Sequence, residues 1–416
     1  MRSFLPLIRS EWRLLLFGFV MTFGSSLGQT YFIGLFGGAI REDLALTHSD
    51  FGGLYSAATL VSALLLLWTG SLIDRVELRR YAYAVSIGLA LACMLMAAST
   101  TALMLFCALL ALRHLGQGLM SLAATTTLVR YLDHHKGKAN ALGGMGYSVS
   151  EAVLPTLVIV LLGLLGWRLS WLVWGALLLV MVPLLTAWLL GDHDRRHRDY
   201  LIDLEAGPAE SSGAQRRHWT RAEVVRDLNF YLFLPALLAQ PLLFTGFMFH
   251  QVQLVTEKDW HLAAWGGLYL FYAAINTLCK LLAGLMVDNY SAIRLVPLVS
   301  LPLGAGLLIL SGGHAFVVAV LFMGLMAVSV GFYSTLSSPF FSEMYGTLHL
   351  GSIKSLTTAA MVLATAVTPV AMGWLIDKGV SLNVMAQAGA CYTVLASALA
   401  LLASYRRRSA ADKRRQ

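Results

Sequence analysis

A lysine, Lys280, lies inside an apolar stretch that runs from Leu268 to Val287. With the exception of Arg113, the other Lys and Arg residues flank such stretches. A lysine in hydrocarbon costs about 3 kcal/mol on insertion scales, so its ammonium must face protein, water or an anion. Two interpretations are open. The ammonium contacts a bound substrate or coupling ion, or the side chain pairs locally or extends toward the membrane interface.

Polar side chains accompany this lysine. Asn276 precedes Lys280 by four residues, so one helical face presents both side chains. Tyr272 lies another four residues earlier, and Gln29 and Tyr31 fall within the first long apolar run of the chain. Amide and hydroxyl groups donate and accept hydrogen bonds, so we expect these side chains to orient a bound substrate.

Three further ionisable residues lie within apolar stretches. Arg113 lies near the middle of one stretch and Glu151 is similarly deep in the next, so we expect the two to pair. Such a pair either holds two helices together or forms part of a proton-linked switch. His250 lies near the end of another stretch, where it relays protons or forms a hydrogen-bonded wall.

The composition identifies a membrane protein. The 416 residues are 58% hydrophobic and 12% charged, with a mean hydropathy of +0.70. A soluble globular chain carries about 25% charged residues, and a soluble core cannot hide this much apolar surface. The four cysteines all lie in apolar stretches, without the spacing of a metal site, and we expect no metal and no cofactor.

The apolar runs predict twelve membrane helices, because a spanning helix needs about 20 apolar residues. A charged segment divides them six against six. The predicted organisation is an N-terminal six-helix bundle at 1–190, a cytoplasmic linker at 191–227, a C-terminal six-helix bundle at 228–404 and a basic cytoplasmic tail at 405–416. The predicted spans are 14–40, 50–72, 81–98, 101–129, 139–164, 169–190, 229–255, 262–286, 292–311, 314–341, 352–376 and 382–404.

The distribution of positive charge predicts the orientation. With a cytoplasmic N-terminus, the inner segments carry 24 of the 30 Lys and Arg residues, and the outer loops carry four. Cytoplasmic segments of membrane proteins have this excess of positive charge, so we expect both termini to be cytoplasmic. The cations flank membrane helices, where they meet anionic lipid, so the net charge of +8 does not indicate nucleic-acid binding.

A charged motif follows the second predicted helix. It reads Gly70-Ser-Leu-Ile-Asp74-Arg75-Val-Glu-Leu-Arg79-Arg80, and a weaker copy, Gly284-Leu-Met-Val-Asp288, follows the eighth helix. The motif resembles the G-x-L-x-D-R-x-G-R-R signature of the major facilitator superfamily. Glu77 and Leu78 depart from that signature. The resemblance implies a conformational latch that breaks on opening, and a solvated charge cluster that sets topology is the alternative.

Two further patterns carry a resemblance. Arg113-His-Leu-Gly116-Gln117-Gly118 is similar to the R-x-x-x-G pattern in the fourth helix of the same superfamily, with Gln117 where glycine is common and a glycine on either side. Asn276-Thr-Leu-Cys-Lys280-Leu-Leu-Ala-Gly284 resembles the eighth helix of the monocarboxylate transporter family, with an amide in place of its acid and a lysine in place of its arginine. Lysine is a point charge where arginine grips a carboxylate with two parallel bonds, so the substrate anion can differ.

The prediction is an all-α membrane protein of the major facilitator fold. The resemblance implies a monomeric secondary transporter in a bacterial inner membrane that moves a small organic anion by alternating access, coupled to protons. Proton-driven export of drugs or metabolites on the same fold is the alternative. A membrane sensor or enzyme is disfavoured, because the sequence has no soluble catalytic domain, P-loop or metal-ligand set.

Overall fold

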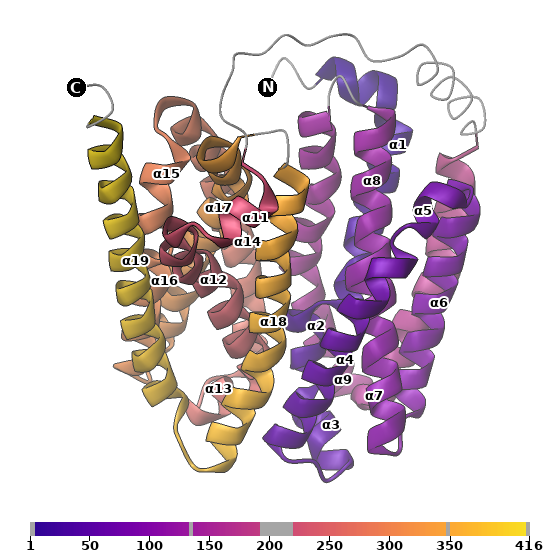
Figure 1. Cartoon of the computed structure of the whole chain (residues 1–416). Coiled ribbons are helices and arrows are strands. Elements are labelled where there is room, and N and C mark those ends of the chain that lie inside the picture. Colours follow the sequence, from indigo (N-terminus) through magenta and orange to yellow (C-terminus); the bar gives the residue numbers. More distant parts are fainter. Residues whose placement is uncertain (1–4, 133–135, 192–218, 347–349, 413–416) are drawn as a thin grey trace. The chain divides into compact units, whose positions relative to one another are not determined.

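The structure is a computed structural model that describes residues 5–132, 136–191, 219–346 and 350–412. Its described residues form helices and turns, with no strand among them, which confirms the predicted all-α class. The chain divides into two compact units, coloured indigo to magenta and pink to yellow in Figure 1. Unit 1 comprises 1–46 and 57–213, and unit 2 comprises 47–56 and 214–416.

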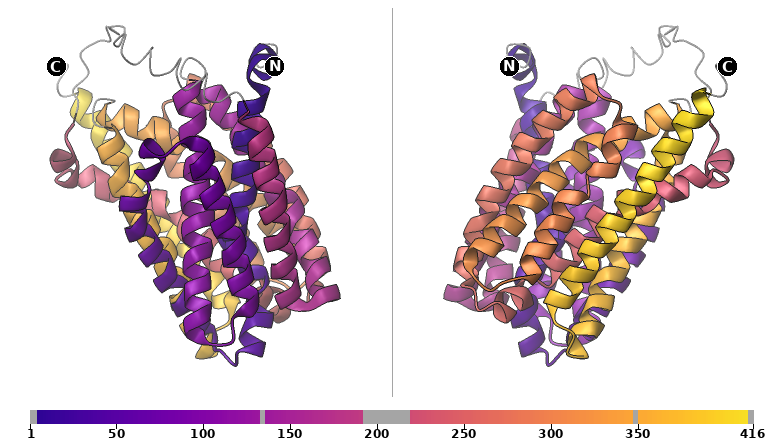
Figure 2. Two further views of the ribbon diagram at one scale, coloured as in Figure 1. Left: turned by 90° about the vertical axis from the view of Figure 1, so that its right-hand side faces the viewer. Right: turned by 90° about the vertical axis from the view of Figure 1, so that its left-hand side faces the viewer.

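The described part of unit 1 contains long helices and several short ones. Figure 2 shows that the axes of its long helices are roughly aligned. These elements are α1 (Leu5–Ser25), the 3₁₀ turn η1 (Ser26–Gly28), α2 (Thr30–Leu35), α3 (Gly37–Asp43), α5 (Leu72–Arg75), α6 (Leu78–Ala98), α7 (Ala102–Ala111), the π-helix η2 (Leu112–Met120), α8 (Ser121–Tyr131) and α9 (Lys136–Leu189). Helix α4 (His48–Thr69) contributes its first residues to unit 2 and the others to unit 1.

Unit 2 has the same character. Its described elements are α11 (Arg221–Val225), α12 (Leu228–Phe249), α13 (Gln251–Glu257), α14 (Leu262–Asn289), α15 (Ala292–Leu295), η4 (Val296–Leu298), α16 (Leu301–Ser311), α17 (Phe316–Tyr345), α18 (Leu350–Asp377) and α19 (Leu382–Asp412). The pair α14 and α17 and the pair α16 and α19 pack along their lengths. The predicted linker falls mainly on 192–218, outside the described residues.

Ten of the described helices are long and apolar enough to cross a membrane. One of them, Lys138–Leu189, has 52 residues, about twice the length that a bilayer needs. Its helical path is interrupted at Gly166, whose φ of 72° favours glycine. Arg168 contacts Asp43 and Ser99, whereas Leu190 contacts Arg79 at the other end of unit 1, so the chain turns back near Gly166. The two arms correspond to the predicted spans 139–164 and 169–190.

The first predicted span is not a single helix. The sequence predicts one helix over 14–40, but the structure divides this stretch among α1, η1, α2 and α3, with extended backbone at Gln29. The predicted span 229–255 is divided similarly, because α12 ends at Phe249 and α13 begins at Gln251. Apolar content locates both stretches in the membrane, but it carries no information about a local break in the backbone.

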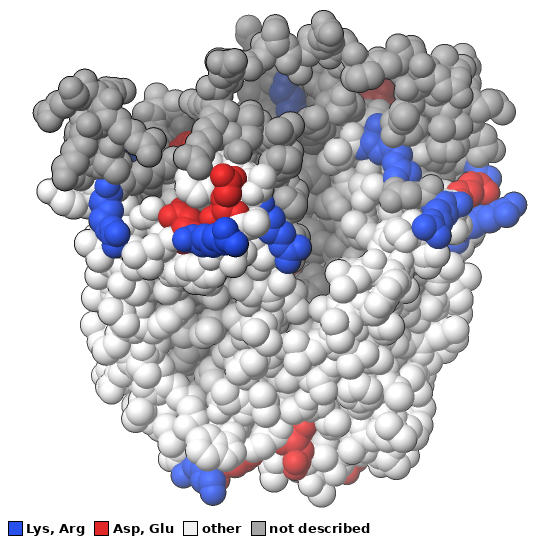
Figure 3. Space-filling view, in the orientation of Figure 1, with Lys and Arg blue, Asp and Glu red and all other residues white. Residues whose placement is uncertain are grey.

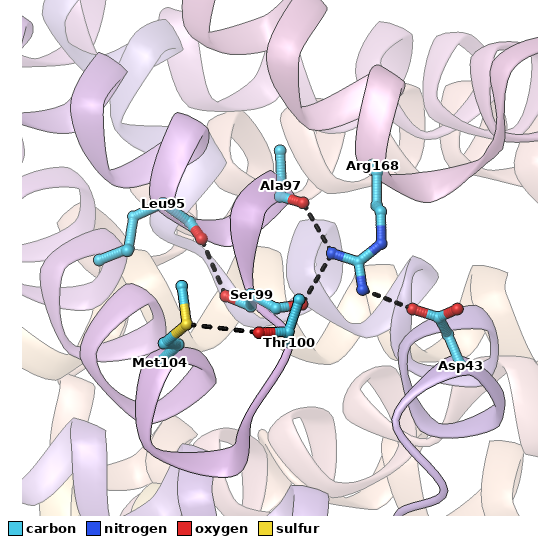
Figure 4. A network of polar contacts seen from close by, with 7 residues as sticks. All are labelled: Asp43, Leu95, Ala97, Ser99, Thr100, Met104 and Arg168. Atoms are coloured by element: carbon cyan, nitrogen blue, oxygen red, sulfur yellow. Dashed lines mark hydrogen bonds and ion pairs between the residues drawn. The ribbon is translucent and has the colours of Figure 1, made fainter.

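Charged side chains cap helix ends in both units. Figure 4 shows Arg168 of unit 1, which donates to the carbonyls of Ala97 (2.8 Å) and Ser99 (2.7 Å) at the end of α6 and to Asp43 (2.6 Å). Its guanidinium also lies 4.2 Å from the centre of the Trp167 ring. These carbonyls have no partner within the helix, so a cation that binds them stabilises the helix end.

Unit 2 uses the same chemistry at a helix C-terminus. Lys258 is buried, and its Nζ donates to the carbonyls of Leu310 (2.6 Å) and Gly313 (2.7 Å) at the end of α16. Burial lowers the pKa of Lys258, and the neighbouring Glu257 opposes this change. Glu257 in turn accepts from the backbone N–H of Leu382, which begins α19 (3.0 Å).

Carboxylates cap helix N-termini in the same way. Asp377 accepts from the backbone N–H groups of His48 (3.0 Å) and Ser49 (2.7 Å) in the first turn of α4. Glu343 accepts from the N–H of Ala292 at the start of α15 (3.0 Å) and from the Ser291 hydroxyl (2.6 Å). The visible described charges in Figure 3 accordingly gather at the ends of the units, with an uncharged band between them.

We expect replacement of Lys258 by Gln to lower the free energy of unfolding by about 2 kcal/mol, because hydrogen bonds to a charged group are lost at two buried carbonyls. Lys378→Gln is the matched control, since Lys378 is an exposed lysine. Thermal unfolding in detergent measures both. Equal melting temperatures for the two variants would contradict the capping role.

Candidate functional site

The first candidate region lies in unit 1, where the first membrane segment is broken. After η1, the backbone at Gln29 becomes extended (φ −84°, ψ 153°), and α2 begins at Thr30. The N–H of Gln29 donates to the carbonyl of Ser26 (3.0 Å), and its own carbonyl accepts from Ile33 (3.1 Å). Broken membrane helices leave backbone groups unpaired within the helix, and these groups need other partners.

Arg113 supplies one such partner. Its side chain is buried, Nη1 donates to the carbonyl of Gly28 (3.1 Å), and Nε donates to the Thr59 hydroxyl (3.1 Å). Arg113 belongs to the π-helix η2, and π-helical segments often mark functional sites. The predicted pairing of Arg113 with Glu151 stays a prediction. The described hydrogen bonds show that Arg113 binds the break in the first segment.

Glycines allow this contact. A Cβ at Gly28 would lie 2.3 Å from the carbonyl oxygen of Leu112 and 2.7 Å from the backbone nitrogen of Gln117. A Cβ at Gly116 would lie 3.0 Å from the Cα of Gly28. The break and the π-helix therefore touch through their backbones, a contact that larger residues would prevent.

A hydroxyl cluster lies beside the break. Ser26 and Ser150 share a hydrogen bond of 2.5 Å, and the Tyr31 hydroxyl donates to Ser150 (3.4 Å). Ser150 also lies 2.8 Å from the Tyr147 carbonyl. Glu151 is half-buried and interacts electrostatically with Tyr31 and Tyr147. Tyr31 and Glu151, both predicted site residues, therefore lie in one polar region of unit 1, and Gln29 lies at the break itself.

The second candidate region lies in unit 2 and centres on Gln251, at the start of α13. Its Oε1 accepts from the indole of Trp265 (2.9 Å) and the hydroxyl of Tyr269 (2.7 Å), and its Nε2 donates to the Met248 carbonyl (2.8 Å). The side chains of Gln251, Trp265 and Tyr269 are all buried. This network joins the end of α12 to α14 and fixes the aromatic face of α14.

His250 lies between α12 and α13. Its Nε2 is 2.9 Å from the carbonyl of Pro369, and because a carbonyl accepts, this nitrogen carries the proton. The ring also packs edge-on against Phe249. This geometry agrees with the hydrogen-bonded wall, one of the two interpretations from the sequence, and a relay role stays a prediction.

Three predicted residues occupy one face of α14. Tyr272 and Asn276 are each 1% exposed, and Lys280 is half-buried. At about 100° per residue, Lys280 lies about 80–180° around the helix from the large exposed apolar side chains of α14. These are Leu270, Phe271, Leu278, Leu281, Leu282 and Leu285.

Asn276 has an unusual environment. Its amide oxygen is buried without a hydrogen-bond partner among the described residues. A Cβ at Gly331 of α17 would lie 2.8 Å from the backbone carbonyl oxygen of Asn276 and 3.2 Å from the backbone nitrogen of Lys280. Helix α17 therefore packs closely on this part of α14. A buried acceptor without a partner costs about 1–3 kcal/mol and needs an explanation, and a bound ligand is one.

The predicted latch motif forms the short helix α5 and its flanks. Gly70 lies at the end of α4, Arg75 is exposed, and Arg80 pairs with Glu77 (3.0 Å). Arg79 donates to the carbonyl of Leu190 (2.6 Å), so within unit 1 it caps the end of α9. The structure does not describe the side chains of Asp74 and Asp288. The latch role therefore stays a prediction.

Sequence reasoning missed several residues of these regions. Ser26, Ser150 and Thr59 are small polar residues in apolar spans, where they are too common to stand out. Gln251 had a signal, since it follows His250 in an apolar stretch. Its role as a shared acceptor depends on the side chains that α14 brings to it.

The fold and these regions define a class, a helical membrane protein with polar groups buried within its spans. The family model described as Major Facilitator Superfamily matches residues 18–369. The chain therefore belongs to the major facilitator superfamily, as its motifs indicated, and is a transporter with a small-molecule substrate, not an enzyme.

Solved structures share the fold. The nucleoside transporter NupG has a TM-score of 0.70 at 13% identity, covering 94% of this chain and 98% of its own. A bacterial homologue of the human lysosomal transporter Spinster, inward-facing and unoccupied, has a TM-score of 0.68 at 13% identity, covering 94% and 96%. No curated protein sequence matches.

We expect Gly28→Ala to destabilise the protein by about 1–3 kcal/mol, because the added methyl group meets backbone atoms that cannot rotate away. Gly144→Ala is the matched control, since nothing lies within 4 Å of a Cβ there. Thermal unfolding in detergent compares the variants. A Gly28→Ala protein as stable as the control would show that the close contact is not needed.

Proposed function

We propose that this transporter moves a small organic anion of the monocarboxylate type by alternating access, with protons as the coupling ion. The observation that carries the proposal is the position of Lys280, half-buried on the face of α14 that also carries the buried Tyr272 and Asn276. An ammonium in an apolar span must face protein, water or an anion, and a substrate anion is the partner that we propose.

The neighbours of Lys280 support a substrate that also donates a hydrogen bond. The buried Asn276 oxygen accepts, and a carboxylate offers no proton to it. A substrate hydroxyl would pair with this oxygen while Lys280 binds a carboxylate oxygen. Tyr272, one turn earlier and fully buried, adds a phenol to the same face. This set favours a hydroxylated monocarboxylic acid.

The polar region of unit 1 supports the coupling role. Glu151 interacts electrostatically with Tyr31 and Tyr147. The Tyr31 hydroxyl connects through Ser150 to Ser26 in the broken first segment, and the Ser150 hydroxyl also donates to the backbone carbonyl of Tyr147. A carboxylate that gains or loses a proton changes its hydrogen bonding with neighbouring hydroxyls. Protonation of Glu151 would therefore alter the environment of the break that Arg113 and Gln29 define.

The proposal includes the setting. We place the protein in a bacterial inner membrane as a monomer, following the family resemblance. Both termini are placed in the cytoplasm, because the positive charge of the sequence is concentrated on the predicted inner segments. The end of unit 1 that carries Arg79 is then cytoplasmic. The alternative, export of drugs or metabolites on the same fold, is tested by the panel of labelled compounds described in the next paragraph.

We expect Lys280→Gln to reduce anion uptake at least about thirtyfold, since removal of one partner of a buried charge pair costs about 2–5 kcal/mol. Uptake into proteoliposomes is measured with a panel of labelled organic acids, nucleosides and amphipathic drugs under an imposed pH gradient. Lys378→Gln serves as the control, because that lysine is exposed. Unchanged anion uptake with Lys280→Gln would refute the proposed site.

For coupling, we expect Glu151→Gln to retain counterflow exchange while it loses accumulation driven by the pH gradient, because the amide cannot carry the coupled proton. Glu42→Gln removes an exposed carboxylate and controls for charge. Both modes are measured in the same proteoliposomes. Loss of both modes, or of neither, would count against Glu151 as the coupling group.

A further inference from the structure

An apolar groove opens on the surface of unit 1. It has a volume of about 300 Å³ and lies between α1, with Phe19, Val20 and Phe23, and the second arm of α9, with Leu177 and Met181. The side chains of Leu177 and Met181 are 48% and 51% exposed, so the groove is open along one side. Almost all of its surface is apolar.

The groove follows matching faces of two helices. Phe19 and Phe23 are four residues apart on α1, and Trp174, Leu178 and Met181 recur at four and three on α9. Such rows each form one helix face. The groove therefore runs along the helices, in the direction that a lipid acyl chain takes in a bilayer.

A pair of tryptophans lies beyond one end of the groove. Trp12 of α1 and Trp188 of α9 continue the two rows, and their ring centres are 5.3 Å apart. Trp12 is about 10 Å from Phe19 along the helix, at 1.5 Å per residue. Both rings are exposed, and tryptophan is enriched where hydrocarbon meets the headgroup region.

Positive charge follows the tryptophans. The guanidinium of Arg13 lies 5.6 Å from the centre of the Trp12 ring, and Arg9 is exposed about one turn further along α1. The intervening Glu11 leaves this segment with a net positive charge, and the helix bends at that residue. Along α1 the apolar groove is thus followed by Arg13 and Trp12 side by side, and then by Arg9.

We propose that this groove binds one anionic phospholipid, with an acyl chain between α1 and α9 and the phosphate at Arg9 and Arg13. Charge complementarity favours an anionic headgroup over a zwitterionic one, by about fivefold for each basic residue near a membrane surface. The inference is independent of the transported substrate. It places a lipid against α1, the helix whose continuation is broken at Gln29.

The test is native mass spectrometry of the full chain in detergent, titrated with phosphatidylglycerol or phosphatidylcholine of matched acyl chains. The wild type should bind one phosphatidylglycerol at least about tenfold more tightly than phosphatidylcholine. The double variant Arg9→Gln, Arg13→Gln should bind both lipids equally. Arg80→Gln is the charge control, because Arg80 is exposed and its described ion pair is with Glu77.

The groove is tested separately. Val20→Trp fills it and should weaken binding of both lipids about tenfold, whereas Val180→Trp adds the same ring at an exposed position of α9 outside the lining. Val20→Phe replaces Val20→Trp if the larger residue prevents folding. Three outcomes would each overturn the proposal. The wild type could bind both lipids with equal affinity, Arg80→Gln could weaken binding as much as the double variant does, or the Val20→Trp protein could still bind lipid tightly.

Discussion

The requirement that every backbone polar group find a partner in a medium without water governs this protein. Within hydrocarbon an unpaired N–H or carbonyl costs several kcal/mol, so helices are the dominant solution and their ends need further partners. The chain meets this need with few charged residues. Arg168 and Lys258 bind carbonyls at helix C-termini, and Asp377 and Glu343 bind N–H groups at helix N-termini.

The same requirement explains the candidate site of unit 1. Once the first segment breaks at Gln29, the carbonyl of Gly28 needs a donor, and the buried guanidinium of Arg113 supplies it. The π-helix that carries Arg113 and the glycine contact at Gly116 bring the donor within reach. Arginine in a membrane span is thus explained locally by backbone geometry, and a role in transport would act through the break that it stabilises.

Unit 2 shows the opposite arrangement, a buried acceptor that the described protein does not satisfy. The side-chain oxygen of Gln251 accepts hydrogen bonds from Trp265 and Tyr269 of α14. The side-chain oxygen of Asn276, further along α14, has no hydrogen-bond partner among the described residues. A fully satisfied network fixes the shape of the helix face, and an unsatisfied group leaves hydrogen-bonding capacity for a ligand. The unsatisfied amide of Asn276 lies one turn from Lys280 and supports α14 as the proposed substrate helix.

The sequence alone determined the membrane class, the helical fold and the family, because apolar runs of fixed length and the motif at Asp74 and Arg75 are local features. It also identified Lys280 and Arg113, since a charge in an apolar span is conspicuous on its own. The tertiary structure decided the rest: the break at Gln29, the use of Arg113 at Gly28, and the environment of Asn276. Each depends on which backbone groups meet across helices distant in sequence, and hydrophobic periodicity does not encode that.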